Sequence, residues 1–228
     1  MRCRWKSPSN KLFISVSIVL LAYLWLESPS QKVPRLVWEL KNRPGGHIDI
    51  LWIGRPDSWI QADFDRLGKR AVPALIKILE SNDLTGQYLA AGQLGRLGDQ
   101  RAVEPLISVL NLGDSVVSKW AMAALGDIGD NRAVDHLIPL LKGENRWIAA
   151  EALGKIGDKR AYESIIPLVK DSDVYARAHA VEAIGCLGDE KAVDLLHEVL
   201  RMERDEWVRG MAMNSLQELK DRGMITEK

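Results

Sequence analysis

The sequence predicts an all-α protein, an α-solenoid in which about five helix pairs stack into a superhelix behind an N-terminal hydrophobic helix. Three observations favour this fold class. A triplet of the type Arg-Ala-Val returns at intervals of 31, 31, 28 and 31 residues from Arg70 onward. Apolar residues within each repeat keep the i, i+4 spacing of a buried helical stripe. The 18 glycines and the aromatic content of only 6% indicate helices that pack through small side chains.

The overall composition excludes several classes of protein. The 228 residues carry 31 basic and 31 acidic side chains. This balance argues against a nucleic-acid partner, because a protein that follows the phosphate backbone needs a basic surplus. The two cysteines, Cys3 and Cys186, are too few for a disulfide framework or a four-ligand zinc site.

Residues 1–30 form a predicted basic leader followed by a hydrophobic segment. Four cations and no acid precede the apolar run Leu12–Leu26. Cations in front of such a run are typical of chains that engage the export machinery. The run is shorter than the about 20 residues of a spanning helix, so a signal-anchor and a cleaved signal peptide both stay open. We expect a repeat domain outside the cytoplasm, anchored in the membrane through residues 12–26 or, after cleavage, secreted or periplasmic.

Residues 31–56 are expected to form a tether and an irregular cap, because prolines and glycines interrupt them. A short amphipathic piece, Val33–Leu40, and an apolar run, His47–Ile53, lie between these breaks. Trp38, Trp52 and Trp59 are expected to pack the cap onto the following repeats. The predicted repeat solenoid occupies residues 57–228. It begins with an unpaired helix, Asp57–Leu67, in front of the first repeat.

Five helix pairs cover roughly residues 68–221. The first helix of each pair carries two apolar columns, which are Leu75, Leu106, Leu137, Ile165 and Leu196, and four residues later Leu79, Leu110, Leu141, Val169 and Leu200. Helices of this length are marginal alone in water, so their stability must come from stacking on neighbouring units.

The second helix of each pair combines a small column with a large one. The small column is Ala90, Ala121, Ala149, Ala180 and Ala212, and the large column, here called the seam column, is Leu94, Leu125, Leu153, Ile184 and Leu216. A glycine follows the seam residue in four units, where we expect another backbone to press close. A second glycine is expected to end each of these helices in the left-handed conformation, at Gly98, Gly129, Gly157 and Gly188. The aspartate after it is placed to cap the next helix.

Three departures from the repeat are expected to shape the stack. Pro139 and Pro167 should bend the first helices of units three and four, because proline removes a backbone donor. Pairs at i, i+4 spacing, Asp173 with Arg177 and Asp205 with Arg209, indicate a charge ladder that aligns adjacent units. Gln217 and Lys220 replace the two glycines in the last unit, as expected of a terminal unit that faces water.

The run RAVDHLIPLLKGENRWIAAEALGKIGDKRA (residues 132–161) resembles the HEAT repeat, and within that group the phycobilisome-lyase HEAT-like type. The alanine-rich helix, the glycine-aspartate turn and the helix-bending prolines carry the resemblance. It covers residues 68–221 and is specific for fold rather than activity, since the shared residues are those that pack. The resemblance implies that the second helices line a concave surface and that the chain holds other proteins.

Side chains at fixed distances from the seam column are expected to face that concave surface. They are Tyr88, Arg96, Asp127, Trp147, Glu151, Lys155 and Glu182. Aromatic anchors among mixed charges are typical of protein interfaces. We therefore expect a non-catalytic protein-protein interaction scaffold or adaptor that is tethered to the membrane, has partner proteins of unknown identity, and uses neither cofactor nor nucleic acid.

Two enzymatic alternatives remain open. A phycobilin lyase-like subunit, which would attach or chaperone a chromophore, is implied by the type of repeat. A metal-dependent hydroxylase is less favoured, because it resembles deoxyhypusine hydroxylase, which holds iron with repeated His-Glu pairs, whereas His197-Glu198 is the one adjacent pair here. His179 and Glu182 have ligand spacing but lack a second pair, and Cys186 has no histidine spaced to activate it.

Overall fold

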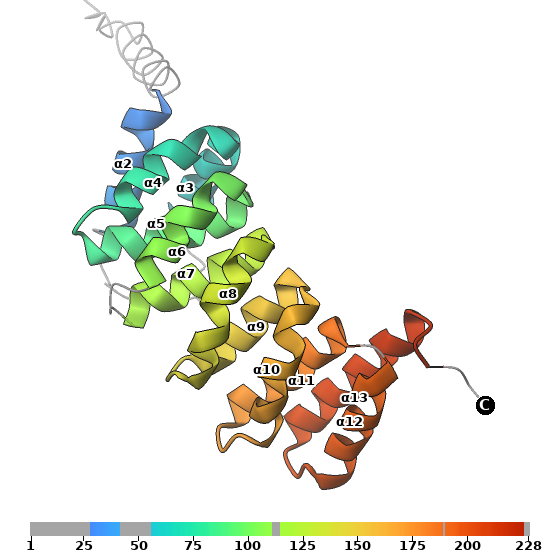
Figure 1. Cartoon of the computed structure of the whole chain (residues 1–228). Coiled ribbons are helices and arrows are strands. Elements are labelled where there is room, and N and C mark those ends of the chain that lie inside the picture. The colour runs from blue at the N-terminus through green and yellow to red at the C-terminus, as the bar shows by residue number, and fades with distance from the viewer. Residues whose placement is uncertain (1–27, 42–55, 111–114, 189, 226–228) are drawn as a thin grey trace, which may run out of the picture.

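The computed structural model describes residues 28–41, 56–110, 115–188 and 190–225. Every regular element in these ranges is helical, and the helices follow one another in a single row (Figure 1). The row begins with α2 (Pro29–Lys41) and α3 (Pro56–Leu67), which precede five helix pairs. The predicted all-α solenoid is therefore confirmed.

Each pair consists of a short first helix and a second helix that returns along it. The pairs are α4 (Val72–Leu79) with α5 (Leu84–Leu97), α6 (Val103–Leu110) with α7 (Ser115–Ile128), α8 (Val134–Leu137) with α9 (Arg146–Ile156), α10 (Tyr162–Ile165) with α11 (Val174–Leu187), and α12 (Glu190–Met202) with α13 (Glu206–Asp221). Single 3₁₀ turns join one unit to the next, at η1 (Gly68–Ala71), η2 (Gln100–Ala102), η3 (Asn131–Ala133) and η5 (Lys159–Ala161).

The apolar columns form one continuous core. The small alanine column is fully buried in all five units, and so are the first four seam residues. The terminal seam residue, Leu216, keeps 9% of its surface exposed. This core explains why the short helices are stable, because each one buries its apolar stripe against the neighbouring unit.

Glycines set the distance between consecutive second helices. A Cβ atom added at Gly126 would lie 2.7 Å from the Cα of Ala152 in the next unit. The same position is equally crowded at Gly95 against Ala124 and at Gly154 against Ala183. The expectation that another backbone presses against these glycines is confirmed.

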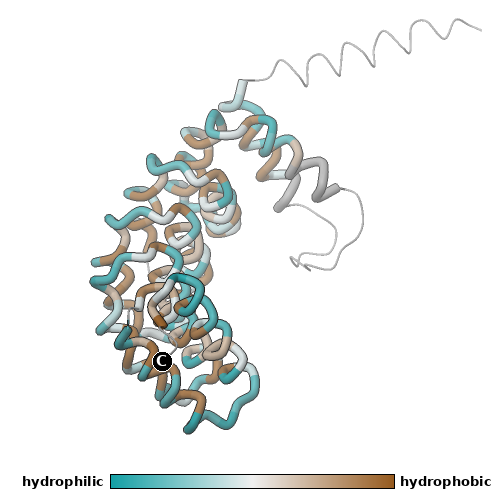
Figure 2. Tube along the Cα trace, turned by 90° about the vertical axis from the view of Figure 1, so that its right-hand side faces the viewer, coloured by the Kyte–Doolittle hydropathy of each residue, from teal (hydrophilic) through white to brown (hydrophobic). Residues whose placement is uncertain are grey.

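The close packing of the second helices determines the curvature. Consecutive second helices pack directly along the stack, whereas consecutive first helices touch at few positions. In a curved stack the layer with the shorter spacing lies at the smaller radius, which places the second helices on the inner side. The trace of the helices bends into an arc (Figure 2).

An Asp–Arg clamp joins units two, three and four each to the unit before it. Asp99 accepts a hydrogen bond from the backbone N–H of Arg101 (3.0 Å), as expected for a cap. The Arg101 guanidinium donates one hydrogen bond to the Asp99 carboxylate (2.8 Å) and another to the backbone carbonyl of Lys69 in the preceding unit (3.0 Å). Arg101 thereby holds the pKa of Asp99 at about 2. The clamp recurs in Asp130 with Arg132 and Asp158 with Arg160.

A second set of ion pairs crosses the units near the start of the second helices. Arg146 on α9 makes two bonds of 2.7 Å to Asp171, which lies just before α11. Arg177 on α11 reaches Glu203, which lies just before α13, at 2.8 Å. The expected ladder therefore exists, but its partners differ from the expected i, i+4 pairs, because Asp173 is occupied in capping α11.

Two of the predicted helix features differ in detail. The α-helices of units three and four end before Pro139 and Pro167 and continue as 3₁₀ helices, η4 (Ile138–Lys142) and η6 (Ile166–Lys170), because proline cannot donate to the preceding turn. Gly188 is extended (φ −75°) rather than left-handed, whereas Gly98, Gly129 and Gly157 adopt the expected conformation. A Cβ at Gly188 would overlap Ala192, so crowding accounts for this glycine.

The segment expected to be a tether and irregular cap contains the regular helix α2. Val33, Leu36 and Val37 are buried, since their i, i+3, i+4 spacing turns them toward α3 and the first unit. Trp38 faces the gap between α2 and the first unit but keeps 63% of its surface exposed, so it covers this junction only in part. The side chains of Trp52 and Trp59 lie outside the described part of the structure. Within the described ranges no helix is long and apolar enough to cross a membrane. The hydrophobic run 12–26 lies outside the described residues.

Replacing Gly126 with alanine tests the contact between second helices. The added methyl group would meet the Ala152 backbone, so Gly126→Ala should lower the free energy of unfolding by about 1–3 kcal/mol. Gly210→Ala is the matched control, because nothing lies within 4 Å of a Cβ there and alanine is the better helix former. Urea denaturation measures the free energy of unfolding of both variants. If Gly126→Ala were as stable as Gly210→Ala, the packing of the second helices described here would be contradicted.

The pH dependence of stability tests the ion pair between units three and four. Arg146 lowers the pKa of Asp171 to about 2, from an ordinary value of 3.8. This carboxylate therefore stabilises the fold fully above about pH 4, and its contribution is lost as the pH falls toward 2. Asp171→Asn should lower the free energy of unfolding by about 1–2 kcal/mol at pH 7 and flatten its fall below pH 4.

Asp135→Asn is the control for this prediction. Asp135 pairs with Arg160 at 3.0 Å but its side chain is 72% exposed, so its loss should change the free energy of unfolding by at most about 0.5 kcal/mol. The comparison is made by thermal melting between pH 2 and pH 7. If thermal stability depended on pH in the same way in both variants, the Asp171–Arg146 pair would stabilise the fold no more than the exposed Asp135–Arg160 pair.

Candidate functional site

The sequence-predicted surface residues lie on four second helices and fall into separate groups. Tyr88 and Arg96 belong to α5, Asp127 to α7, Trp147, Glu151 and Lys155 to α9, and Glu182 to α11. Tyr88 stacks on Trp120 of α7, with 6.3 Å between ring centroids. Arg96 is exposed at the far end of α5. The remaining five residues lie on the three consecutive second helices α7, α9 and α11.

An aromatic row, defined as Trp147, Tyr175, His179 and Trp207, crosses three consecutive units. The ring centroid of Trp147 lies 5.2 Å from that of His179, in a stacked arrangement, and 6.2 Å from that of Tyr175. Trp207 meets Tyr175 edge-on at 5.3 Å. Tyr175 is 55% exposed and Trp207 is 42% exposed. The row thus offers adjoining aromatic surfaces to solvent, whereas most large apolar side chains of the repeats are buried.

Helix starts bring these rings into line. Trp147, Tyr175 and Trp207 are each the second residue of their helix. Asp173 caps α11 through the backbone N–H of Tyr175, and Asp205 caps α13 through that of Trp207, both at 3.0 Å. The caps therefore fix where each helix begins and, with it, where each ring lies.

Sequence reasoning missed Tyr175 and Trp207. Positions were counted back from the seam column, which aligns Tyr175 and Trp207 with Glu144 rather than with Trp147. Unit three is three residues shorter than its neighbours, so its aromatic residue moves relative to the seam but not relative to the helix start. The aspartate two residues before Tyr175 and Trp207 was the available signal.

A charged cluster adjoins the aromatic row. The Lys155 ammonium donates to Asp127 of α7 and pairs with Glu151 of its own helix, both at 2.9 Å. Burial opposes its charge, but the two carboxylates prevail and raise the pKa of Lys155. Glu182 lies 3.4 Å from His179, and this imidazole lowers the pKa of the Glu182 carboxyl. The cluster supplies mixed charges beside the rings, as an interface rim does.

The candidate catalytic groups lie on two helices, His179, Glu182 and Cys186 on α11 and His197 with Glu198 on α12. In the described part of the chain no three histidine, cysteine, aspartate or glutamate side chains group so as to hold a metal ion. His197 is exposed on α12, far along the chain from the His179–Glu182 pair. Burial raises the pKa of the Cys186 thiol, which disfavours the thiolate that a nucleophile requires.

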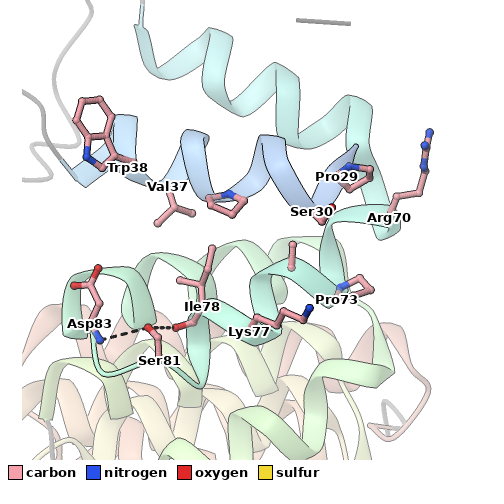
Figure 3. A pocket seen from close by; sticks show the side chains of 12 residues that line it. Pro29, Ser30, Val37, Trp38, Arg70, Pro73, Lys77, Ile78, Ser81 and Asp83 are labelled. Carbon is pink, nitrogen blue, oxygen red and sulfur yellow. Dashed lines mark hydrogen bonds between the residues drawn. The ribbon is translucent and has the colours of Figure 1, made fainter. Parts of the chain in front are cut away.

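A groove lies between α2 and the first repeat unit, at the opposite end of the row of helices. Figure 3 shows α2 and α4 as its walls. Its volume is about 580 Å³, within the range of small-molecule sites. Pro34, Val37, Ala74 and Ile78 give it an apolar lining, and Arg70 and Lys77 add two cations. None of the sequence-predicted site residues lines it.

Comparison with known proteins gives relatives for the repeats. The solved complex of CpcE and CpcF of phycocyanin lyase from Nostoc sp. PCC7120 is 28% identical to this chain, with a TM-score of 0.54 and 73% of each chain covered. An engineered protein is 19% identical, with a TM-score of 0.53, over 86% of this chain and 92% of its own. A designed armadillo repeat protein is 16% identical, with a TM-score of 0.50, over 83% and 92%. The last two likenesses concern the fold alone.

The family assignment rests on the repeats themselves. No curated protein matches the sequence. The family model for HEAT repeats matches residues 72–148 and 141–217, which together cover more than half of the chain. The matched stretch contains the glycine contacts, the Asp–Arg clamps and the aromatic row described above. The chain belongs to the HEAT-repeat family.

Proposed function

We propose that this chain is a non-catalytic protein-binding subunit whose partner docks on the aromatic row. The observation that carries the proposal is the contact of aromatic rings across three consecutive second helices, with Tyr175 and Trp207 exposed and Trp147 half-buried. Tryptophan and tyrosine are enriched among residues that dominate binding energy. The mixed charges of Asp127, Glu151, Lys155 and Glu182 would then lie at the rim of the contact. The solved CpcE–CpcF relative is itself a complex of two proteins, which supports a protein partner.

Loss of the exposed rings tests this proposal. A partner protein should co-purify with the wild-type chain. The amount that co-purifies with the double variant Tyr175→Ala/Trp207→Ala should be about tenfold lower, since each ring is expected to act as an anchor. The measurement is affinity purification from native membranes after mild crosslinking, with the retained protein quantified by mass spectrometry.

Met202→Ala provides the control for this experiment. Met202 is 76% exposed at the end of α12 and takes no part in the aromatic row. Its replacement should leave the co-purifying protein at the wild-type amount. Retention of the same protein by the double variant would refute the aromatic row as the docking surface.

Phycobilin attachment or chaperoning is a second candidate function. It is favoured by the 28% identity to the phycocyanin lyase complex, which spans 73% of this chain. A flat chromophore could stack on the same rings, because aromatic faces bind conjugated systems well. Adding a phycobilin to the full chain should then shift the absorption spectrum of the pigment, and Trp147→Ala should abolish the shift. An unchanged spectrum for the wild type would remove this candidate.

We further propose that residues 12–26 tether the chain to a membrane and hold the repeats outside the cytoplasm. The proposal is supported by the four cations before the apolar run and by the absence of acids among residues 1–11. A tether would place α2, whose first residue is Pro29, next to the membrane surface.

A further inference from the structure

The lining of the groove between α2 and α4 runs along α2 from Pro29 to Trp38. Val37 on α2 points toward Ile78 on α4, and Trp38 stands at one end (Figure 3). Pro34 of α2 and Ala74 of α4 also line the groove. Val37 and Ala74 are almost fully buried, whereas Trp38 keeps 63% of its surface exposed. An acyl chain lying along the groove would cover the exposed surface of Pro34 and Trp38 and part of Ile78, which is favourable in proportion to the area removed from water.

The two ends of the groove differ in charge. Arg70 lies beside Pro29 and Ser30 at the end opposite Trp38, and the Lys77 ammonium points toward the same end (Figure 3). Both side chains are exposed, and neither has an ion-pair partner within the described ranges. Asp83 lies at the Trp38 end. The groove is therefore cationic at the end where α2 begins.

The repeat pattern shows that this charge is peculiar to the first unit. Arg70 stands in the column of the clamp arginines, but Gly68 occupies the place of the clamp aspartate, so Arg70 lacks the partner that Arg101 has. Pro73 stands in a column that is acidic in every later unit, at Glu104, Asp135, Glu163 and Asp194. Lys77 stands in a column that holds serine, proline or glutamate elsewhere, at Ser108, Pro139, Pro167 and Glu198. Compared with the later units, the first unit lacks the two acidic side chains at positions 68 and 73 and gains a basic one at Lys77, all beside the groove.

The position of the groove in the chain indicates where its ligand comes from. Helix α2 begins at Pro29, three residues after the apolar run ends at Leu26. Three residues span at most about 10 Å. The link between the apolar run and α2, which begins at the cationic end of the groove, is therefore no longer than about 10 Å. If that run enters a bilayer, Arg70 and Lys77 lie at the depth of the lipid headgroups.

We propose that this groove binds one anionic phospholipid. Its phosphate is held by Arg70 and Lys77, and one acyl chain lies along Pro34, Val37 and Ile78 toward Trp38. The commitment to a lipid rests on the proposed membrane tether. An acidic segment of a partner protein would offer similar charge, but the short link to the apolar run favours the lipid.

Photocrosslinking of the full chain in lipid nanodiscs tests the proposal. The nanodiscs contain phosphatidylcholine and a phosphatidylglycerol with a photoreactive group on its acyl chain. Crosslinked peptides should fall within residues 29–38 and 73–81. Arg70→Glu/Lys77→Glu should reduce these crosslinks by about tenfold, because each cation near an anionic headgroup contributes to binding. The matched control Lys142→Glu/Lys159→Glu makes the same change of charge on exposed side chains outside the groove.

The outcomes separate the groove from the tether. A chain that inserts but gives crosslinks spread evenly, or equal yields in both double variants, refutes the groove and leaves the tether intact. A chain that fails to enter nanodiscs refutes the tether, and dihexanoyl phosphatidylglycerol below its micelle concentration then tests the groove by native mass spectrometry. The site is supported if this lipid binds and if the dihexanoyl phosphatidylcholine analogue and glycerol phosphate both bind more weakly. Its displacement by a tighter-binding peptide rich in glutamate and leucine overturns the proposal in favour of a protein partner.

Discussion

The near contact of backbones at Gly95, Gly126 and Gly154 is the constraint on which the rest of the structure depends. Each glycine lets the alanine of the next second helix approach to a distance that any side chain would prevent. The second helices are thereby drawn together while the first helices stay apart, and a stack with unequal spacing in its two layers must curve. The curvature in turn brings Trp147, Tyr175 and Trp207, which belong to different units, into contact on the inner side. The glycine–alanine contacts between second helices therefore position the aromatic residues of the row next to one another.

The packing columns explain how much of this could be predicted from the sequence. Leu153, Ala149 and Gly154 have a fixed spacing because every unit must bury the same stripe, so helix existence, pairing and the glycine contacts all follow from periodicity. The aromatic row did not follow, because its register is set by where each helix starts. The three-residue shortening of unit three separates that register from the seam column. The docking of α2 was missed for a related reason, since prolines suggested irregular chain while Val33 and Leu36 supplied enough buried surface for a helix to form around Pro34.

Departures from the repeat carry most of the information about function. In the middle of the stack, arginines at the clamp positions are neutralised by their own aspartates and reach back to the preceding unit. In the first unit the same column holds an arginine without that aspartate, because there is no earlier repeat for the clamp to fasten. A residue freed from a structural role at the end of a solenoid is available for binding, so Arg70 rather than Arg101 can hold a ligand.

The two proposed surfaces differ in chemistry because they lie on different parts of the stack. The groove beside α2 combines an apolar lining with cations, whereas the aromatic row on α9, α11 and α13 combines exposed rings with paired charges. Between them the units are joined by backbone-close helix contacts, clamps and the Arg146–Asp171 pair. A lipid bound beside α2 would therefore do more than strengthen attachment. By fixing the first unit against a membrane, it would set the direction in which the aromatic row faces its partner.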